Sequence, residues 1–215
     1  MSADNENQPP PPGQHRFSVE DARARAEQAY RKSEIIFTRA YGLLREPNKE
    51  WQQIKAEETT VPHILIGYVA PLAAIPPVAG LIGALIFEPM RVGPLGSALI
   101  SVVVTWIVTV ALVFLLGVLI NTLADQFDAD RDDLAAQKIA AYSLTPAFLS
   151  GLFSLYPGIW WLSLFALGAM VFIMYRGLPI LMKAPAERAL SYAATVTIAG
   201  MVAGIVLFSL ASCVG

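Results

Sequence analysis

Charged residues are absent from four long stretches of this chain, and their absence restricts the possible folds more than any other feature. Residues 64–87, 92–124, 139–175 and 189–215 contain no Asp, Glu, Lys or Arg and are rich in Leu, Ile, Val, Ala and Phe. A helix needs about 20 apolar residues to cross a bilayer core about 30 Å thick. The sequence therefore predicts an all-α membrane protein with several spans.

The third stretch is too long for a single crossing, because 139–175 as one helix would reach roughly 55 Å. Its middle contains Tyr156-Pro157-Gly158, a combination typical of a turn, followed by Trp160 and Trp161, which favour the membrane interface. We therefore predict a bundle of five transmembrane helices, at about residues 64–87, 95–124, 138–155, 159–175 and 189–212. The alternative has four spans, with one of the third and fourth segments re-entrant.

Basic residues indicate the orientation, since Lys and Arg concentrate in cytoplasmic loops. With five spans, all 15 Lys and Arg except Arg91 fall on the side of the N-terminus. The predicted N-terminus is cytoplasmic and the predicted C-terminus lies outside.

The polar region before the first span divides into two parts. Residues 1–17 include four consecutive prolines and are predicted to form a disordered tail. Residues 18–60 are predicted to form cytoplasmic amphipathic and interfacial helices, followed by the transmembrane domain at 61–215. The apolar stripe near Ile36 and Leu44 packs on the protein itself or on lipid, or alternatively binds a partner. Pro47 is expected to begin a short interfacial helix that Trp51 anchors in the membrane surface.

Two features of the spans bear on packing. Pro71, Pro76 and Pro77 predict a bent first helix, whose freed carbonyls must be satisfied by neighbouring helices or side chains. Gly200 and Gly204 allow close helix approach, either within the chain or in a dimer.

The sequence shows no arrangement of residues typical of a catalytic or metal site. The predicted spans hold no ionisable group well inside the membrane, which argues against ion-coupled transport. Asp128, Asp130 and Asp132 match the start of a calcium loop, but Asp133 and Ile139 stand where that loop needs Gly and Glu. We read a solvated acidic loop, with Asp128 starting the next helix. We predict no catalytic residue, no metal site, no cofactor and no nucleic-acid binding.

The segment before the last span mixes apolar residues and prolines with Arg176, Lys183 and Arg188. We predict a loop whose apolar side chains insert into the cytoplasmic surface of the membrane. Its basic side chains are expected to meet lipid phosphates or the acidic loop at 125–133.

Four segments carry a family resemblance: LREPNKEWQQI at 44–54, YVAPL at 68–72, KIAAYSLTP at 138–146 and YRGLPILMKAP at 175–185. Over residues 40–208 the chain resembles the bacterial branch of the Yip1 family. The resemblance implies five spans, a cytoplasmic N-terminus and no catalytic residues. Its motif positions are the expected partner- or lipid-binding residues, namely Pro47, Trp51, Tyr142, Thr145, Pro146, Gly177, Leu178, Pro179 and Lys183.

The function expected from these observations is that of a non-enzymatic integral membrane protein of the bacterial inner membrane. It would act as a scaffold or interaction partner through its cytoplasmic face, in membrane organisation or traffic. The expected partners are membrane lipids, together with other membrane proteins or a second copy of the chain. The alternative is a passive transporter or channel for a lipid or small solute.

Overall fold

The computed structural model describes residue 23, residue 34 and residues 36–212, which belong to two units, 1–38 and 39–215. The described residues of the first unit are helical. The predicted tail at 1–17, and the predicted helix over most of residues 18–33, lie outside the described residues.

The described part of the second unit is built from helices and contains no strand. It begins with a helix over residues 39–45. The elements that follow are α2 (Pro47–Ala56), α3 (Val61–Ile64), η1 (Leu65–Val69), α4 (Ala70–Ala73), α5 (Ile75–Phe87), η2 (Pro89–Arg91), α6 (Leu95–Leu123), η3 (Ala124–Phe127), α7 (Asp133–Ser143), α8 (Thr145–Ser150), η4 (Gly151–Leu155), η5 (Pro157–Leu162), α9 (Ser163–Leu181) and α10 (Ala186–Ser212).

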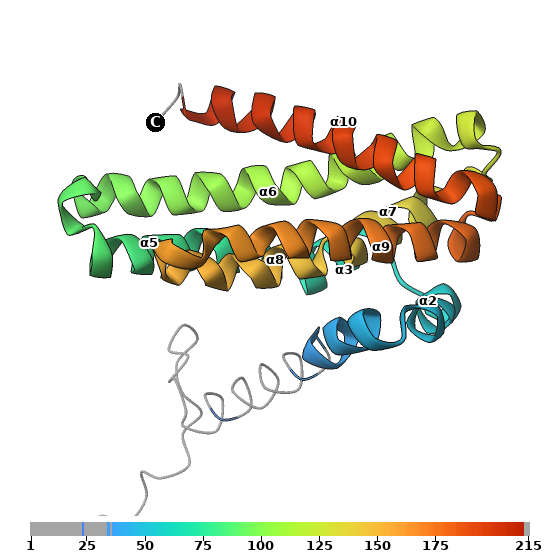
Figure 1. Cartoon of the computed structure of the whole chain (residues 1–215), viewed down its shortest axis with the longest axis horizontal. Coiled ribbons are helices and arrows are strands. Elements are labelled where there is room, and N and C mark those ends of the chain that lie inside the picture. The colour runs from blue at the N-terminus through green and yellow to red at the C-terminus, as the bar shows by residue number, and fades with distance from the viewer. Residues whose placement is uncertain (1–22, 24–33, 35, 213–215) are drawn as a thin grey trace, which may run out of the picture. The chain divides into compact units, whose positions relative to one another are not determined.

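Four helical segments are long and apolar enough to cross a membrane: Val61–Phe87, Leu95–Phe127, Pro157–Leu181 and Ala186–Leu210. Their main helices α5, α6, α9 and α10 run along one another, with α6 packed on α5 and α10 and with α9 packed on α10 (Figure 1). Apolar side chains such as Ile107, Phe165 and Ile205 stay exposed on their outer faces. Such faces suit a lipid environment, where they need no cover.

The third predicted span has a different construction from the other four. Residues 133–155 form α7, α8 and η4 in succession, with an interruption at Leu144 and a change from α-helix to 3₁₀-helix at Gly151. This segment packs through α7 on α6 and α9, and through η4 on α5. The predicted turn after it is confirmed, because Tyr156 has an extended backbone between η4 and η5.

The first span is interrupted near its prolines, as the sequence predicts. Residues Leu65–Val69 widen into a π-helical turn, and the helix is interrupted at Ala74, just before Pro76 and Pro77. One turn before this interruption, the carbonyl of Ala70 accepts a hydrogen bond of 2.7 Å from Trp106 Nε1 of α6. A neighbouring side chain therefore satisfies a carbonyl at the bend, as the low dielectric of lipid requires.

Glycines allow the closest helix contacts. A Cβ atom on Gly83 of α5 would lie 2.4 Å from the Ser154 carbonyl oxygen of η4, which is closer than real Cβ atoms approach. A Cβ on Gly200 of α10 would lie 2.7 Å from Leu116 of α6, and one on Gly204 would lie 3.4 Å from Leu112. Gly200 therefore allows close packing of α10 on α6 within the chain.

The packing is densest at one end of the bundle. We call this the α7 end; it lies at the right of Figure 1. It comprises the helix at 39–45, α2, α7, the last turns of α9, the first turns of α10, the loop at 128–132 and the loop at 182–185. Fully buried large side chains gather here, among them Trp51, Tyr192, Leu43, Ile54, Ile139, Met174 and Leu178. At the opposite end, Trp160 and Trp161 are exposed. The α7 end also carries most of the family-motif residues.

Candidate functional site

Trp51 joins α2 to the bundle. Pro47 opens α2, which places Trp51 and Ile54 on one face, and both are fully buried. The indole Nε1 donates a hydrogen bond of 3.0 Å to the Ile173 carbonyl of α9. The predicted role of Trp51 as an anchor in the membrane surface is wrong, because the protein itself encloses the ring.

Gly177 of α9 makes room for that ring. A Cβ on Gly177 would lie 2.7 Å from Cε2 and Cζ2 of Trp51, so any side chain here would displace the indole. Gly177 and Trp51 belong to two separate sequence motifs, and the structure brings them into direct contact.

Two tyrosines continue the cluster into α7 and the first span. The ring of Tyr142 meets Trp51 edge to face at 6.3 Å between centroids and meets Tyr68 at 4.6 Å. The Thr145 hydroxyl donates to the Tyr142 carbonyl at 2.7 Å, so the Tyr68 hydroxyl donates in turn to Thr145 Oγ1 at 2.8 Å. We call Trp51, Tyr68, Tyr142, Thr145 and Gly177 the aromatic cluster.

The remaining motif residues support these helices. Pro146 is buried in the first turn of α8, directly after the interruption at Leu144. Leu178 is fully buried on α9, and Pro179 lies inside that helix. The prediction that the fourth span ends at Tyr175 and gives way to a loop is therefore wrong. The helix continues to Leu181 with Pro179 inside it, and the missing amide of Pro179 costs α9 one internal hydrogen bond.

A charged group lies over the aromatic cluster. The guanidinium of Arg39 forms ion pairs with Glu50, at 2.7 Å, and with Glu57, and lies 5.7 Å from the centre of the Tyr142 ring. Burial lowers the pKa of Arg39, but the hydrogen bond to Glu57 and the charges of both carboxylates outweigh this and raise it above its ordinary value. Arg39 therefore ties the helix at 39–45 to both ends of α2.

The two loops of the α7 end are joined by ion pairs, as the sequence predicts. Lys183 Nζ lies 2.6 Å from Asp130, and Arg188 lies 2.8 Å from Asp128. The Asp130 amide also donates to the Met182 carbonyl at 2.8 Å. The hydrogen bond and charge of Asp130 raise the pKa of Lys183.

Two details of this region differ from the prediction. Arg176 does not join the ion pairs, and its guanidinium instead lies 5.3 Å from the Phe172 ring centre. Asp128 does not start the next helix, because its backbone is left-handed with φ 54°. Helix α7 begins at Asp133, and the side chain of Asp132 caps it by accepting from the Ala135 amide at 2.9 Å.

Sequence reasoning missed Arg39, Tyr68 and Lys138. Arg39 reaches partners 11 and 18 residues away, and Lys138 Nζ donates to the Ile54 and Glu57 carbonyls at 2.7 and 2.8 Å. These contacts join separate elements, so local spacing gave no sign of them. The KIAAYSLTP and YVAPL motifs include Lys138 and Tyr68, which is the only signal that pointed to them. Within the described residues, no group of three or more His, Cys, Asp or Glu is placed to hold a metal ion.

The helical spans and the motif residues gathered at the α7 end define an integral membrane protein, and a family model agrees with this class. The Yip1 domain model matches residues 41–208, and the chain belongs to the Yip1 family. It is 30% identical over 180 residues to the inner membrane protein YohC of Escherichia coli K12, covering 79% of this chain and 92% of that protein. The inner membrane protein YohC of Escherichia coli O6:H1 matches to the same extent. No solved structure matches.

Proposed function

We propose that this chain is a non-enzymatic membrane scaffold or interaction partner, which acts through the α7 end in membrane organisation or traffic. The observation that carries the proposal is the construction of that end. The aromatic cluster and Arg39 hold α2 and the helix at 39–45 on the bundle. Through these contacts the motif residues fix the position of α2 and of the helix at 39–45. A surface held in one position is suited to binding a partner.

The proposed orientation turns the α7 end toward the cytoplasm, with α2 and the loops at 128–132 and 182–185 outside the lipid core. The charge asymmetry of the sequence supports this, since all Lys and Arg except Arg91 then face the cytoplasm. The name of the Escherichia coli relative, an inner membrane protein, supports the bacterial inner membrane as the location. In this arrangement α7, α8 and η4 form a fifth crossing, because their combined length is sufficient for a core about 30 Å thick.

The helix at 39–45 offers a surface for a partner. Ala40 and Leu43 are buried, whereas Tyr41 and Leu44 are 59% and 50% exposed. We propose that these two exposed apolar side chains contact the partner. The proposed partners are another membrane protein or a second copy of the chain, with membrane lipids around both.

Crosslinking mass spectrometry on intact membranes at native expression tests this role. We expect reproducible crosslinks from residues 39–56 or 182–188 to one protein partner. The double variant Tyr41→Ser/Leu44→Ser should lose these crosslinks while its unfolding midpoint stays unchanged, because both side chains are exposed. Gln52→Ala, at an exposed site on α2, is the matched control. Absence of any partner, or crosslinks that survive the double variant, would contradict the proposal.

The alternative role as a passive route for a lipid or small solute stays a prediction from the sequence. Flux measurements in liposomes address it directly.

A further inference from the structure

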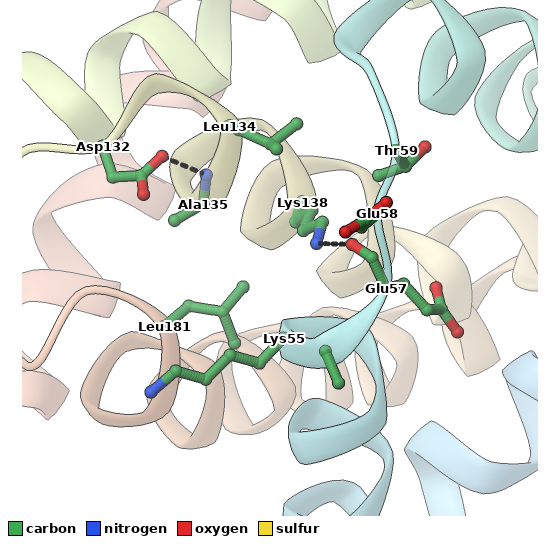
Figure 2. A pocket seen from close by; sticks show the side chains of 10 residues that line it. Lys55, Glu57, Glu58, Thr59, Asp132, Leu134, Ala135, Lys138 and Leu181 are labelled. Carbon is green, nitrogen blue, oxygen red and sulfur yellow. Dashed lines mark hydrogen bonds between the residues drawn. The ribbon is translucent and has the colours of Figure 1, made fainter.

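A pocket of about 450 Å³ lies at the α7 end, between the C-terminus of α2, the segment at 57–59, the start of α7 and the last residue of α9 (Figure 2). Its lining combines both signs of charge with apolar side chains. The charged residues are Lys55, Glu57, Glu58, Asp132 and Lys138, and the apolar ones include Leu134, Ala135 and Leu181.

Lys138 supplies a buried positive charge to this pocket. The residue is only 4% exposed, and its Nζ donates to the carbonyls of Ile54 and Glu57. An ammonium has three N–H groups, so one remains after these two bonds. No carboxylate of the described residues forms an ion pair with it. The charges of Glu57 and Asp132 act on this ammonium without forming an ion pair with it, and a phosphate in the pocket would accept from the remaining N–H group.

Two carboxylates of the pocket are free to meet a positive charge. The Glu57 carboxylate is engaged by Arg39, and one oxygen of Asp132 caps α7. The second Asp132 oxygen and the Glu58 carboxylate have no hydrogen-bond partner among the described residues. A simple anion would be repelled by these two groups, and a simple cation by Lys138 and Lys55. A ligand that carries one positive and one negative group can pair with the two carboxylates and with the two ammonium groups.

We propose that this pocket binds a zwitterionic headgroup with an ammonium and a phosphate. The phosphate would lie against Lys138 and Lys55, and the ammonium against Glu58 and Asp132. Leu181 ends the candidate span Pro157–Leu181, so the pocket lies at the depth of lipid headgroups. A phospholipid would rest its glycerol region on Leu134 and Leu181. This inference goes beyond the scaffold role, since it requires no protein partner.

The first test measures lipid retention by native mass spectrometry. The delipidated full chain is mixed in detergent with phosphatidylethanolamine, phosphatidylglycerol and phosphatidylcholine of equal acyl length. We expect phosphatidylethanolamine to be retained most. Phosphatidylglycerol has no ammonium, and the methylated ammonium of phosphatidylcholine has no N–H to donate to a carboxylate.

Substitutions locate the site. Glu58→Gln should reduce retention of phosphatidylethanolamine about tenfold and spare phosphatidylglycerol, whereas Lys55→Gln should reduce both. Both residues are exposed, so folding should be preserved. The matched controls are Glu46→Gln and Lys49→Gln, which break an exposed ion pair at the other end of α2. Equal retention of phosphatidylethanolamine and phosphatidylglycerol, or equal losses in Glu58→Gln and Glu46→Gln, would overturn the proposal.

A soluble compound with the same headgroup shows whether the pocket binds a membrane lipid or a free zwitterion. Glycerophosphoethanolamine should displace retained phosphatidylethanolamine only at much higher concentration, because it lacks the apolar contacts. Binding of the soluble compound as tight as that of the lipid would support the zwitterion site and assign it to a soluble ligand. If an excess of the soluble compound displaces no lipid, the headgroup is not what the pocket recognises.

Discussion

Trp51 lies where three helices meet. Its indole N–H bonds α9, its ring faces Tyr142 of α7, and its edge fills the space above Gly177. The contacts come from α7 and α9, both distant from α2 in the sequence, and together they hold α2 against the bundle.

Replacing Trp51 should destabilise the protein in two steps. Trp51→Phe removes the donor to the buried Ile173 carbonyl and should lower the free energy of unfolding by about 1–3 kcal/mol. Trp51→Ala also leaves a cavity and should cost about 3–5 kcal/mol. Chemical unfolding in detergent measures both. The control Trp161→Phe changes an exposed residue, and a loss there as large as that of Trp51→Phe would contradict the assignment.

Gly177 and Gly168 form a matched pair on α9. Gly177→Ala places a methyl group against Trp51 and should cost about 1–3 kcal/mol through overpacking. Gly168 has open space around it, so Gly168→Ala should be neutral or stabilising by up to about 1 kcal/mol. Thermal unfolding followed by circular dichroism compares the two. Equal midpoints would show that the indole does not occupy this space.

Substitutions at Lys183 distinguish the effect of backbone strain on stability from the effect of the ion pair. Its φ of 52° is left-handed, and its Nζ pairs with Asp130 on the surface. Lys183→Ala and Lys183→Gly both remove the ion pair, but only glycine adopts this backbone without cost. The glycine variant should therefore unfold about 2–4 °C above the alanine variant. The reverse order would argue that the loop has another conformation.

At the scale of elements, glycines and one tryptophan decide how the helices meet. Gly83 lets α5 touch the backbone of η4, and Trp106 bonds the carbonyl of Ala70 beside the bend of the first span. Both contacts are made to segments that depart from regular α-helix, namely the 3₁₀-helix η4 and the bend of the first span. Their loss should therefore affect the bundle beyond the site of substitution.

The pair Gly83 and Gly80 on α5 tests the contact with η4. A Cβ on Gly83 would meet two carbonyl oxygens, and backbone atoms move less readily than side chains, so Gly83→Ala should cost about 1–3 kcal/mol. Gly80 has nothing near it, so Gly80→Ala should leave the midpoint unchanged or slightly raised. Thermal unfolding in detergent is sufficient. A Gly83→Ala midpoint equal to that of Gly80→Ala would mean that α5 and η4 are farther apart.

At the scale of the whole molecule, the charge-free stretches located four helices long enough to span a membrane, because lipid excludes charge from such segments. The ion pairs between the loops were also predictable, since the charges of the two segments are opposite. The burial of Trp51 was not predictable, because its partner Ile173 lies 122 residues away. The same limit applies to Arg39. The break at Leu144 was predictable in principle, because Pro146 has no amide for the Tyr142 carbonyl, which accepts from the Thr145 hydroxyl instead.

We propose that the aromatic cluster fixes α2 on the bundle and so presents the α7 end as a surface. Hydrogen–deuterium exchange of the chain in lipid nanodiscs tests it most directly. The amides of residues 51–56 should be protected in the native chain, and should lose that protection in Trp51→Ala while the amides of α6 keep theirs. Rapid exchange of α2 in the native chain, or exchange that Trp51→Ala leaves unchanged, would contradict this account.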